Sequence, residues 1–285
     1  MPACGKRPAP LSTLAMQYSY IPCLSIAGFD PSGGAGIAAD IKTFSALGCY
    51  AAAAITAITS QSTRGVSAMQ PVSAEWITRQ VLPVIEDLRP VALKIGMTCN
   101  REIIRSIAGI LRAHPFPFVV LDPVMISSSG HPLMENDAMK CLADELLPLC
   151  HLVTPNLHEL HALGGETDPI LSARRLIQRY GARQILVKGG HREGLPTDIL
   201  VSEMGETSFP GQRIATRNDH GTGCTLSAAI AAYVARGEML PAAIEHAKDF
   251  VSKALEAGAD IHIGDGHGPL NHFFGPLPLL VKEKL

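Results

Sequence analysis

The chain lacks the features that mark several large classes of protein. It has little charge and no excess of either sign: 18% of its 285 residues are charged, and the formal net charge is −2. Such a chain has no broad positive field with which to hold a nucleic acid or an anionic membrane. No apolar run is long enough to span a bilayer. The sequence therefore predicts neither a nucleic acid nor a membrane as a partner.

Cysteine and histidine occur without the spacing of a disulfide framework or a zinc site. The seven cysteines are odd in number and contain no C-x-x-C pair. We expect most of them to be small core residues in a reducing compartment, which predicts a cytoplasmic protein. The eleven histidines contain no H-x-x-x-H pair of the zinc-hydrolase type. Residues 1–20 lack the apolar segment of a secretory signal, and we expect a poorly ordered extension there.

The chain does contain a regular alternation of β-type and helix-type segments. Strands are predicted at 23–27, 51–58, 92–95, 118–121, 152–153 and 184–188, and helices at 36–47, 74–88, 101–113, 136–147, 157–163 and 173–180. Further along we expect a hairpin over 197–204 and 206–209, a short strand at 213–216, and helices at 222–235 and 241–257. This alternation predicts an α/β fold in which helices cover both faces of a mostly parallel sheet. We expect a single domain over residues 21–285.

The stretch from Asp219 to Cys224 carries the strongest functional signal. Gly221 and Gly223 lie where a helix begins, so backbone N–H groups can converge on an anion in front of the helix dipole. That geometry suits a phosphoryl group in transfer. Cys224 would lie in the first turn, where a thiol pKa is lowered, and its thiolate could accept a proton from an attacking hydroxyl. A simple helix-capping turn with a packed cysteine is about equally favoured by the spacing alone.

A second glycine-rich turn, residues 33–36, follows the first predicted strand. Its G-x-G-x-x-A pattern is typical of dinucleotide-binding proteins and raises the alternative of a dinucleotide-dependent oxidoreductase. That motif also needs an acidic residue at the end of the next strand, where Thr59 and Gln61 stand instead, and Asp40 comes too early. The turn therefore favours the close approach of the backbone to a small substrate.

Polar residues follow three further predicted strands. Asn156 and Glu159 are three positions apart on one helical face, and such oxygen ligands can hold magnesium together with phosphate. Taken alone, the pair is better explained as a helix cap. Lys188 precedes two glycines and can reach a phosphate, or it can be a surface lysine beside a turn. Asp122 can help to place a metal, or it can be a turn residue before proline.

Three residues are candidates for contact with a substrate. The Gln61 amide offers a donor and an acceptor, which suits the edge of an aminopyrimidine. Asp40 can orient a hydroxyl group, and Met97 can pack against a flat ring. For each of the three residues by itself, an ordinary place in a loop or the core is the more common explanation.

Together these motifs resemble the hydroxymethylpyrimidine kinase/phosphomethylpyrimidine kinase family of the ribokinase superfamily, over residues 22–275. The segments that carry the resemblance are 27–36, 40–44, 61–65, 94–97, 121–125, 154–159, 188–191, 220–224 and 266–269. The resemblance implies a ribokinase-like three-layer sandwich without a separate lid domain, commonly found as a homodimer. It implies phosphorylation of 4-amino-5-hydroxymethyl-2-methylpyrimidine and then of its monophosphate, for thiamine biosynthesis, with ATP and Mg²⁺. Phe29 departs from the family pattern, which has a small hydroxyl residue there.

The resemblance also implies a role for each candidate residue. Cys224 would be the catalytic base, and the backbone of Gly221, Thr222 and Gly223 would form the anion hole. Residues implied at the substrate are Gln61, Asp40, Met97, Gly28 and Thr59; those at ATP are Lys188, Thr154, Asn156 and Thr222; those at magnesium are Asp122, Asn156 and Glu159. A pyridoxal kinase of the same superfamily would use the same chemistry and stays open as an alternative. A protein that only binds its ligand would need no base at Cys224.

Overall fold

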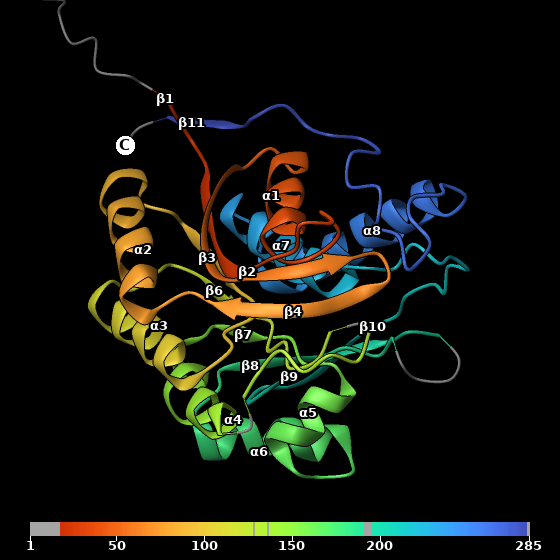
Figure 1. Ribbon diagram of the computed structural model, residues 1–285. Helices are drawn as coiled ribbons and strands as arrows, with labels where there is room; N and C mark the ends of the chain where they lie inside the picture. The colour runs from red at the N-terminus through yellow and green to blue at the C-terminus, as the bar shows by residue number, and fades with distance from the viewer. Residues whose placement is uncertain (1–17, 128, 136, 191–194, 284–285) are drawn as a thin grey trace, which may run out of the picture.

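A nine-stranded sheet runs through the middle of the protein (Figure 1). The computed structural model describes residues 18–127, 129–135, 137–190 and 195–283. In order across the sheet, the strands are β10 (Gly205–Phe209), β9 (Asp198–Ser202), β8 (Gln184–Val187), β7 (Leu152–Val153), β6 (Val119–Leu121), β5 (Ala92–Ile95), β2 (Pro22–Phe29), β3 (Tyr50–Ser62) and β4 (Gly65–Pro71). The strands from β8 to β3 run parallel, and antiparallel strands complete both edges. The prediction of a mostly parallel sheet is confirmed.

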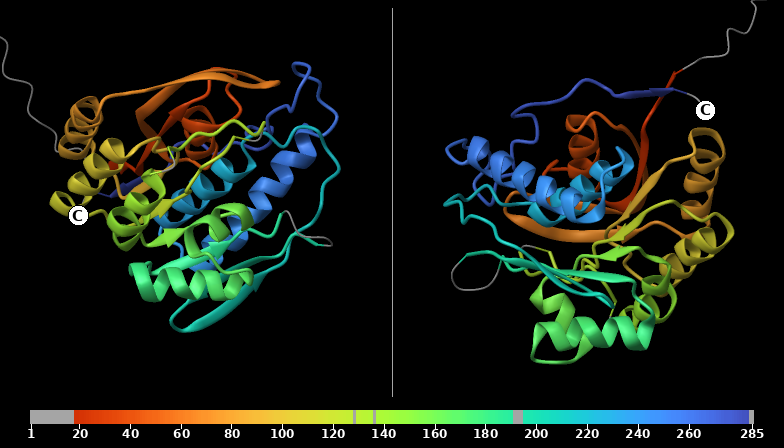
Figure 2. Two further views of the ribbon diagram at one scale, coloured as in Figure 1. Left: turned by 60° about the horizontal axis from the view of Figure 1, so that its bottom comes forward. Right: turned by 180° about the vertical axis from the view of Figure 1, so that it is seen from behind.

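Helices cover both faces of this sheet (Figures 1 and 2). One layer contains α1 (Gly36–Ala46), α7 (Thr222–Ala235) and α8 (Leu240–Gly258). The other contains α2 (Ala74–Leu88), α3 (Arg101–Ala113), α4 (Ala138–Cys141), α5 (Leu157–Gly164) and α6 (Pro169–Tyr180). Each layer packs on the sheet through its own cluster of buried apolar side chains. This arrangement confirms the three-layer α/β fold.

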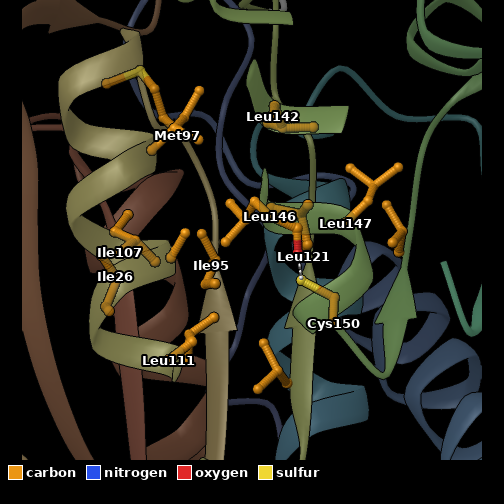
Figure 3. Packing of buried hydrophobic residues seen from close by; sticks show 14 of the residues in the cluster. Ile26, Ile95, Met97, Ile107, Leu111, Leu121, Leu142, Leu146, Leu147 and Cys150 are labelled. Carbon is orange, nitrogen blue, oxygen red and sulfur yellow. Dashed lines mark hydrogen bonds between the residues drawn. The ribbon is translucent and has the colours of Figure 1, made fainter. Parts of the chain in front are cut away.

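Helix α3 illustrates how the sequence builds one of these layers. Asn100 caps the helix, since its side chain accepts a hydrogen bond from the N–H of Ile103 at 3.0 Å. Ile103, Ile107 and Leu111 then recur at helical spacing and are buried against the sheet. Figure 3 shows Ile107 and Leu111 in the same apolar cluster as Ile95 of β5. Burial of each such side chain contributes about 1.5–3 kcal/mol of hydrophobic free energy.

The strand order changes direction at β2, and this change fixes the position of the site. The chain passes from β2 to β3 on one side, and it later returns to place β5 on the other side of β2. In sheets of this kind, ligands bind in the crevice beyond the carboxyl ends of strands at such a switch point. The glycine turn after β2 and the loop after β5, which contains Met97, both begin there.

Three predicted elements differ from the structure. The strand predicted at 51–58 extends further as β3, to Ser62, and forms a hairpin with β4, a strand that was not predicted. Residues 213–216 form no strand among the described residues. The helix predicted at 136–147 becomes α4, a π-helical turn at Leu142–Leu146 and a 3-10 turn at Leu147–Leu149. Pro148 lacks the N–H that a continuing α-helix needs, and residue 136 lies outside the described residues.

The two ends of the described chain meet outside the main sheet. β1 (Tyr18–Tyr20) pairs antiparallel with β11 (Val281–Glu283) (Figure 1). The last three residues of the predicted extension, 18–20, thus form a strand, and residues 1–17 lie outside the described part; poor order over this segment stays a prediction. No helix among the described residues has the length and apolar character needed to cross a membrane.

Candidate active site

The start of α7 lies against the glycine turn that follows β2. Gly221 has φ 88°, a left-handed conformation that favours glycine. A methyl group on Gly221 would lie 1.9 Å from the carbonyl oxygen of Gly34, so only glycine lets the two turns meet. No side chain caps α7, and the N–H groups of Gly223 and Cys224 in its first turn have no acceptor within the helix. The Thr222 hydroxyl donates to the Asp219 carbonyl oxygen at 2.6 Å.

Lys188, which is partly exposed, forms a cluster with two buried carboxylates beside this turn. Its Nζ lies 2.6 Å from Asp122 Oδ1 and 3.8 Å from Glu159 Oε2. A methyl group on Gly223 would lie 3.4 Å from Lys188 Nζ and 3.6 Å from Asp122 Oδ2. The ends of β6 and β8 and the start of α5 therefore bring a cation and two carboxylates to the start of α7. The structure thus brings together Lys188, Asp122, Glu159 and the glycine turn, as the sequence predicts.

Burial and the attraction between opposite charges shift the pKa values of Glu159 and Lys188 in opposite directions. Burial raises the pKa of Glu159 to about 7, although Lys188 lowers it, and Asp122 raises it further. Burial alone would lower the pKa of Lys188, but the attraction of Asp122 and Glu159 outweighs it and holds that pKa well above its usual value. Lys188 is therefore an ammonium ion, while Glu159 changes its protonation near neutral pH.

Asn156 and Thr154 have structural roles in the same region. The Asn156 side chain accepts from the N–H of Glu159 at 2.9 Å, and the Glu159 carboxylate accepts from the N–H of Asn156 at 2.8 Å. This reciprocal cap confirms the helix-cap explanation, and a direct contact of Asn156 with magnesium or ATP would compete with it. Thr154 is fully buried, and its Oγ1 lies 3.2 Å from Asp122 Oδ1. Both residues therefore hold the carboxylates of the cluster in place.

The oxygen ligands at this cluster suit a magnesium ion that is also bound by phosphate and water, and not an ion held by protein side chains alone. The described residues contain no group of three or more His, Cys, Asp or Glu side chains that could hold an ion by themselves. Magnesium, however, is commonly held by one or two carboxylates together with water and phosphate oxygens. Asp122 and Glu159 lie beside the glycine turn and fit this second mode.

On the other side of the glycine turn, Gln61 belongs to a polar network. Its amide Nε2 lies 3.2 Å from His220 Nε2, and its Oε1 lies 3.1 Å from Thr59 Oγ1. His220 Nε2 also lies 2.8 Å from Asp30 Oδ2. Gln61 lines a hollow of about 480 Å³ along the β3–β4 hairpin, together with Ser60, Ser62, Arg64, Gly65, Val66, Ser67 and Ser129. A polar ligand can therefore reach this amide.

His220 and Asp30 were not among the predicted site residues. Both lie in segments that carry the family resemblance, but their contact joins residues 190 positions apart. Local pattern contains no signal for such a pairing. The sequence indicated only that each residue precedes a glycine turn, Asp30 the first turn and His220 the second.

Met97 occupies the switch point between β2 and β5. Its side chain is buried, and a methyl group on Gly28 would lie 2.2 Å from Met97 Cε. The absence of a side chain at Gly28 therefore makes room for Met97. Packing of Met97 against a flat substrate ring stays a prediction.

Asp40 does not lie where a substrate could contact it. Its side chain is fully buried, and its Oδ2 accepts hydrogen bonds from Lys94 Nζ at 2.8 Å and from the Ser25 hydroxyl at 2.5 Å. The prediction that Asp40 orients a substrate hydroxyl is wrong on this geometry. An ion pair with a lysine 54 positions away cannot be read from local sequence.

Cys224 lies in the first turn of α7 and is half-buried. Burial raises the pKa of its thiol to about 11; the Lys94 ammonium lowers this pKa, Asp40 and Asp122 raise it, and a backbone hydrogen bond from Gly36 lowers it. The expected lowering of this pKa at the helix start is therefore wrong, because burial and two carboxylates outweigh the favourable groups. Cys224 carries its proton at neutral pH.

Known proteins resemble this chain over most of its length. A family model described as phosphomethylpyrimidine kinase matches residues 30–271. A hydroxymethylpyrimidine/phosphomethylpyrimidine kinase of Rhizobium meliloti (strain 1021) is 49% identical over 256 residues, which are 88% of this chain and 96% of that protein. The crystal structure of phosphomethylpyrimidine kinase from Clostridium difficile 630 has a TM-score of 0.73 at 39% identity, over 82% of this chain and 99% of that one. A pyridoxal kinase from Staphylococcus aureus in complex with AMP-PCP and pyridoxal has a TM-score of 0.80 at 28% identity, over 93% of this chain and all of that one (100%). The chain belongs to the phosphomethylpyrimidine kinase family.

Proposed function

We propose that this protein phosphorylates 4-amino-5-hydroxymethyl-2-methylpyrimidine with ATP, and then phosphorylates the resulting monophosphate to the diphosphate, in thiamine biosynthesis. The observation that carries the proposal is the cluster of Lys188, Asp122 and Glu159 beside the start of α7, in a chain of this family. The Rhizobium meliloti relative is named for both steps. The Staphylococcus aureus structure contains AMP-PCP, an ATP analogue, which supports ATP as the co-substrate.

The proposed reaction forms a bond between the substrate oxygen and the γ-phosphorus, and it breaks the bond from that phosphorus to ADP. In the first step the attacking alcohol loses its proton, and the proposed acceptor is the thiolate form of Cys224, a small fraction of the protein at neutral pH because burial raises the pKa of this thiol to about 11. The Gly223 and Cys224 N–H groups and the Lys188 ammonium stabilise the charge on the transferred group. Magnesium, when bound with ATP, supplies further positive charge at the phosphates, and Asp122 and Glu159 are the residues proposed to hold it.

The direct test is to incubate the purified protein with ATP, Mg²⁺ and the hydroxymethylpyrimidine, and to follow ADP release together with the masses of the products. We expect the monophosphate to form first and the diphosphate to follow, and we expect no product when Mg²⁺ is omitted. Failure to consume ATP with this pyrimidine would contradict the proposed function.

Replacement of the proposed base tests its role separately. Cys224→Ala should lower kcat by about a hundredfold or more, the scale of lost general-base assistance, while the Kd for the pyrimidine changes little. Cys150→Ala is a matched control, because Cys150 is buried outside the site and should leave kcat unchanged. A Cys224→Ala variant with normal kcat would show that another group takes the proton.

A pyridoxal kinase activity is the second candidate. The Staphylococcus aureus pyridoxal kinase matches the fold closely, although its sequence identity is lower than that of the pyrimidine kinases. Both substrates are flat heteroaromatic alcohols, so the ratio of the two kcat/KM values decides between them. The expected homodimer and cytoplasmic location stay predictions; sedimentation equilibrium would test the first, and fractionation of cells the second.

A further inference from the structure

We propose that His220 is a positioning residue that fixes the orientation of the Gln61 amide, and with it the donor and acceptor that this amide offers to a substrate. In the proposed orientation the amide oxygen faces His220 and the NH₂ group faces Thr59. The inference rests on the proposed function, because it specifies how the pyrimidine would be read. It follows from counting the hydrogens available to each group in the network.

The Asp30 carboxylate fixes the hydrogen on His220. It accepts from the N–H and the hydroxyl of Ser32 at 2.8 and 2.7 Å, from the N–H of Gly34 at 3.2 Å and from the N–H of Ala35 at 2.9 Å. Burial raises the pKa of Asp30, but hydrogen bonds from His220 and Ser32 outweigh it and leave the pKa below its usual value. An ionised carboxylate can only accept, so His220 Nε2, 2.8 Å away, must carry a hydrogen.

The surroundings of His220 hold this N–H in one direction. The side chain is buried, and a methyl group on Gly34 would lie 2.3 Å from its Cδ2. The backbone N–H of His220 donates to the Gly268 carbonyl oxygen at 3.0 Å. The backbone of His220 is therefore bound to Gly268, and its imidazole lies against Gly34 of the first glycine turn. Its Nε2–H faces both Asp30 and the Gln61 amide.

The Gln61 atom that faces His220 must then be an acceptor. An amide NH₂ group opposite an Nε2–H would place two donors 3.2 Å apart. A turn of the amide by 180° exchanges its nitrogen and oxygen without moving other atoms, and the hydrogen-bond network decides between the two orientations. The His220 contact therefore selects the orientation in which the Gln61 oxygen faces the imidazole.

The contact with Thr59 is better satisfied in the same orientation. The Thr59 hydroxyl has one hydrogen but two acceptors within reach, the Phe29 carbonyl oxygen at 3.0 Å and Gln61 Oε1 at 3.1 Å. If the amide is turned so that its NH₂ group faces Thr59, the hydroxyl can donate to Phe29 and accept from Gln61, and neither acceptor competes for the hydrogen. The His220 contact thus selects the orientation, and the Thr59 contact is compatible with it.

The fixed amide still has one N–H and one oxygen lone pair to offer. Together they match an amino group next to a ring nitrogen, the edge that an aminopyrimidine presents and a pyridoxal ring does not. If His220 no longer specified the orientation, the amide would present donor and acceptor in reversed places part of the time. The affinity for the pyrimidine would fall, while the chemical step at Cys224 would continue.

The test compares substitutions that keep or remove the donor. His220→Leu should raise KM for the hydroxymethylpyrimidine about tenfold, the scale of one hydrogen bond, with kcat little changed. His220→Gln restores a side-chain N–H and should recover most of the loss. Thr59→Val removes the acceptor on the other side and should raise KM similarly, whereas Thr59→Ser should not. In a Gln61→Leu background, His220→Leu should raise KM no further.

Several results would overturn the proposal. One such result is an unchanged KM in His220→Leu. Another is an equal rise in KM in His220→Leu and His220→Gln, which would show that the volume of the imidazole ring, and not its N–H, is what matters. A tenfold loss that persists in the Gln61→Leu background would show that His220 acts elsewhere. If His220→Leu fails to fold, the Thr59 pair and His220→Gln still decide the question. If the wild-type protein does not phosphorylate the pyrimidine, the proposed function fails, and calorimetric binding of the pyrimidine to the same variants tests this inference.

Discussion

Among the single residues of the site, Cys224 has the property that is most directly measurable. Burial raises its pKa to about 11, and Lys94 only partly opposes this. A raised pKa keeps the thiol protonated at neutral pH, so the thiolate fraction should increase about tenfold for each pH unit up to that value. We expect alkylation of Cys224 by iodoacetamide in the ligand-free protein to accelerate in the same proportion from pH 7 to pH 9, as followed by peptide mass spectrometry.

The same protonation should govern catalysis if Cys224 is the base. kcat/KM reports the groups of the free enzyme, so it should rise with pH over the same range. The other described cysteines are buried and serve as internal controls for alkylation. A rate of alkylation that levels off near pH 7 would contradict the raised pKa and restore the lowered pKa expected from the helix start.

Sequence reasoning at the residue scale succeeded where the partner is close in the chain. The cap formed by Asn156 and Glu159 spans three positions and was identified as an alternative from their spacing. It failed where the partner is remote. Asp40 is neutralised by Lys94, and His220 is oriented by Asp30; the folded chain alone brings these pairs together.

At the scale of elements, two helical glycines with different surroundings provide a comparison. Gly109 is exposed in α3, and a methyl group there would meet nothing within 4 Å. Gly109→Ala should therefore stabilise the protein by about 0.5–1 kcal/mol, because alanine restricts the unfolded chain and favours the helix. In α5, a methyl group on Gly164 would lie 2.9 Å from the carbonyl oxygen of Ser172, so Gly164→Ala should destabilise the protein.

Urea unfolding of both variants measures the difference. Activity should be unchanged in Gly109→Ala, since this residue has no contact with the site. A destabilised Gly109→Ala variant would show that the exposed face of α3 has a tertiary role that its open surroundings do not reveal.

The elements predicted best are those with strong periodicity and clear boundaries. The bounds of α2, α3 and α7 agree with the predicted helices at 74–88, 101–113 and 222–235. β4 was missed because it is an edge strand. Its extended conformation depends mainly on pairing with β3, and local sequence does not reveal that pairing. The break after α4 depends on Pro148 and on packing, which a helical pattern of apolar residues does not distinguish from a continuous helix.

On the scale of the whole molecule, the site exists because the sheet changes direction at β2. The parallel strands end at one edge, so residues that are distant in sequence reach the same place there. Strand alternation was sufficient to predict this edge and the loops along it. The pairings within the site required the tertiary structure, because they join α1 to β5 and the turn after β2 to the start of α7.

One ion pair links the layers of the molecule and permits a test of how they are held together. Lys94 of β5 and Asp40 of α1 are both fully buried, with 2.8 Å between Nζ and Oδ2, and Ser25 of β2 donates to the same carboxylate. Removal of one partner from a buried pair typically costs about 3–5 kcal/mol, because an unpaired charge remains in the core. We expect this loss in Lys94→Met, and a smaller one than the sum of the single variants in Lys94→Met/Asp40→Leu.

The pH dependence of stability in Lys94→Met shows most clearly whether the charge of Asp40 depends on Lys94. Burial already raises the pKa of Asp40, and only Lys94 and Ser25 oppose it. Without Lys94 this pKa rises further above its value in the unfolded chain, so folding favours the protonated acid, and stability is lost as pH increases through the folded pKa. Lys94→Met should therefore lose less stability at pH 5 than at pH 8 in urea unfolding.

Lys253→Met, which breaks the exposed pair with Asp249 at 2.7 Å, should lose about 0.5 kcal/mol or less at either pH. Equal losses at both pH values for Lys94→Met, or additive losses in the double variant, would show that the charge of Asp40 is satisfied without its partner.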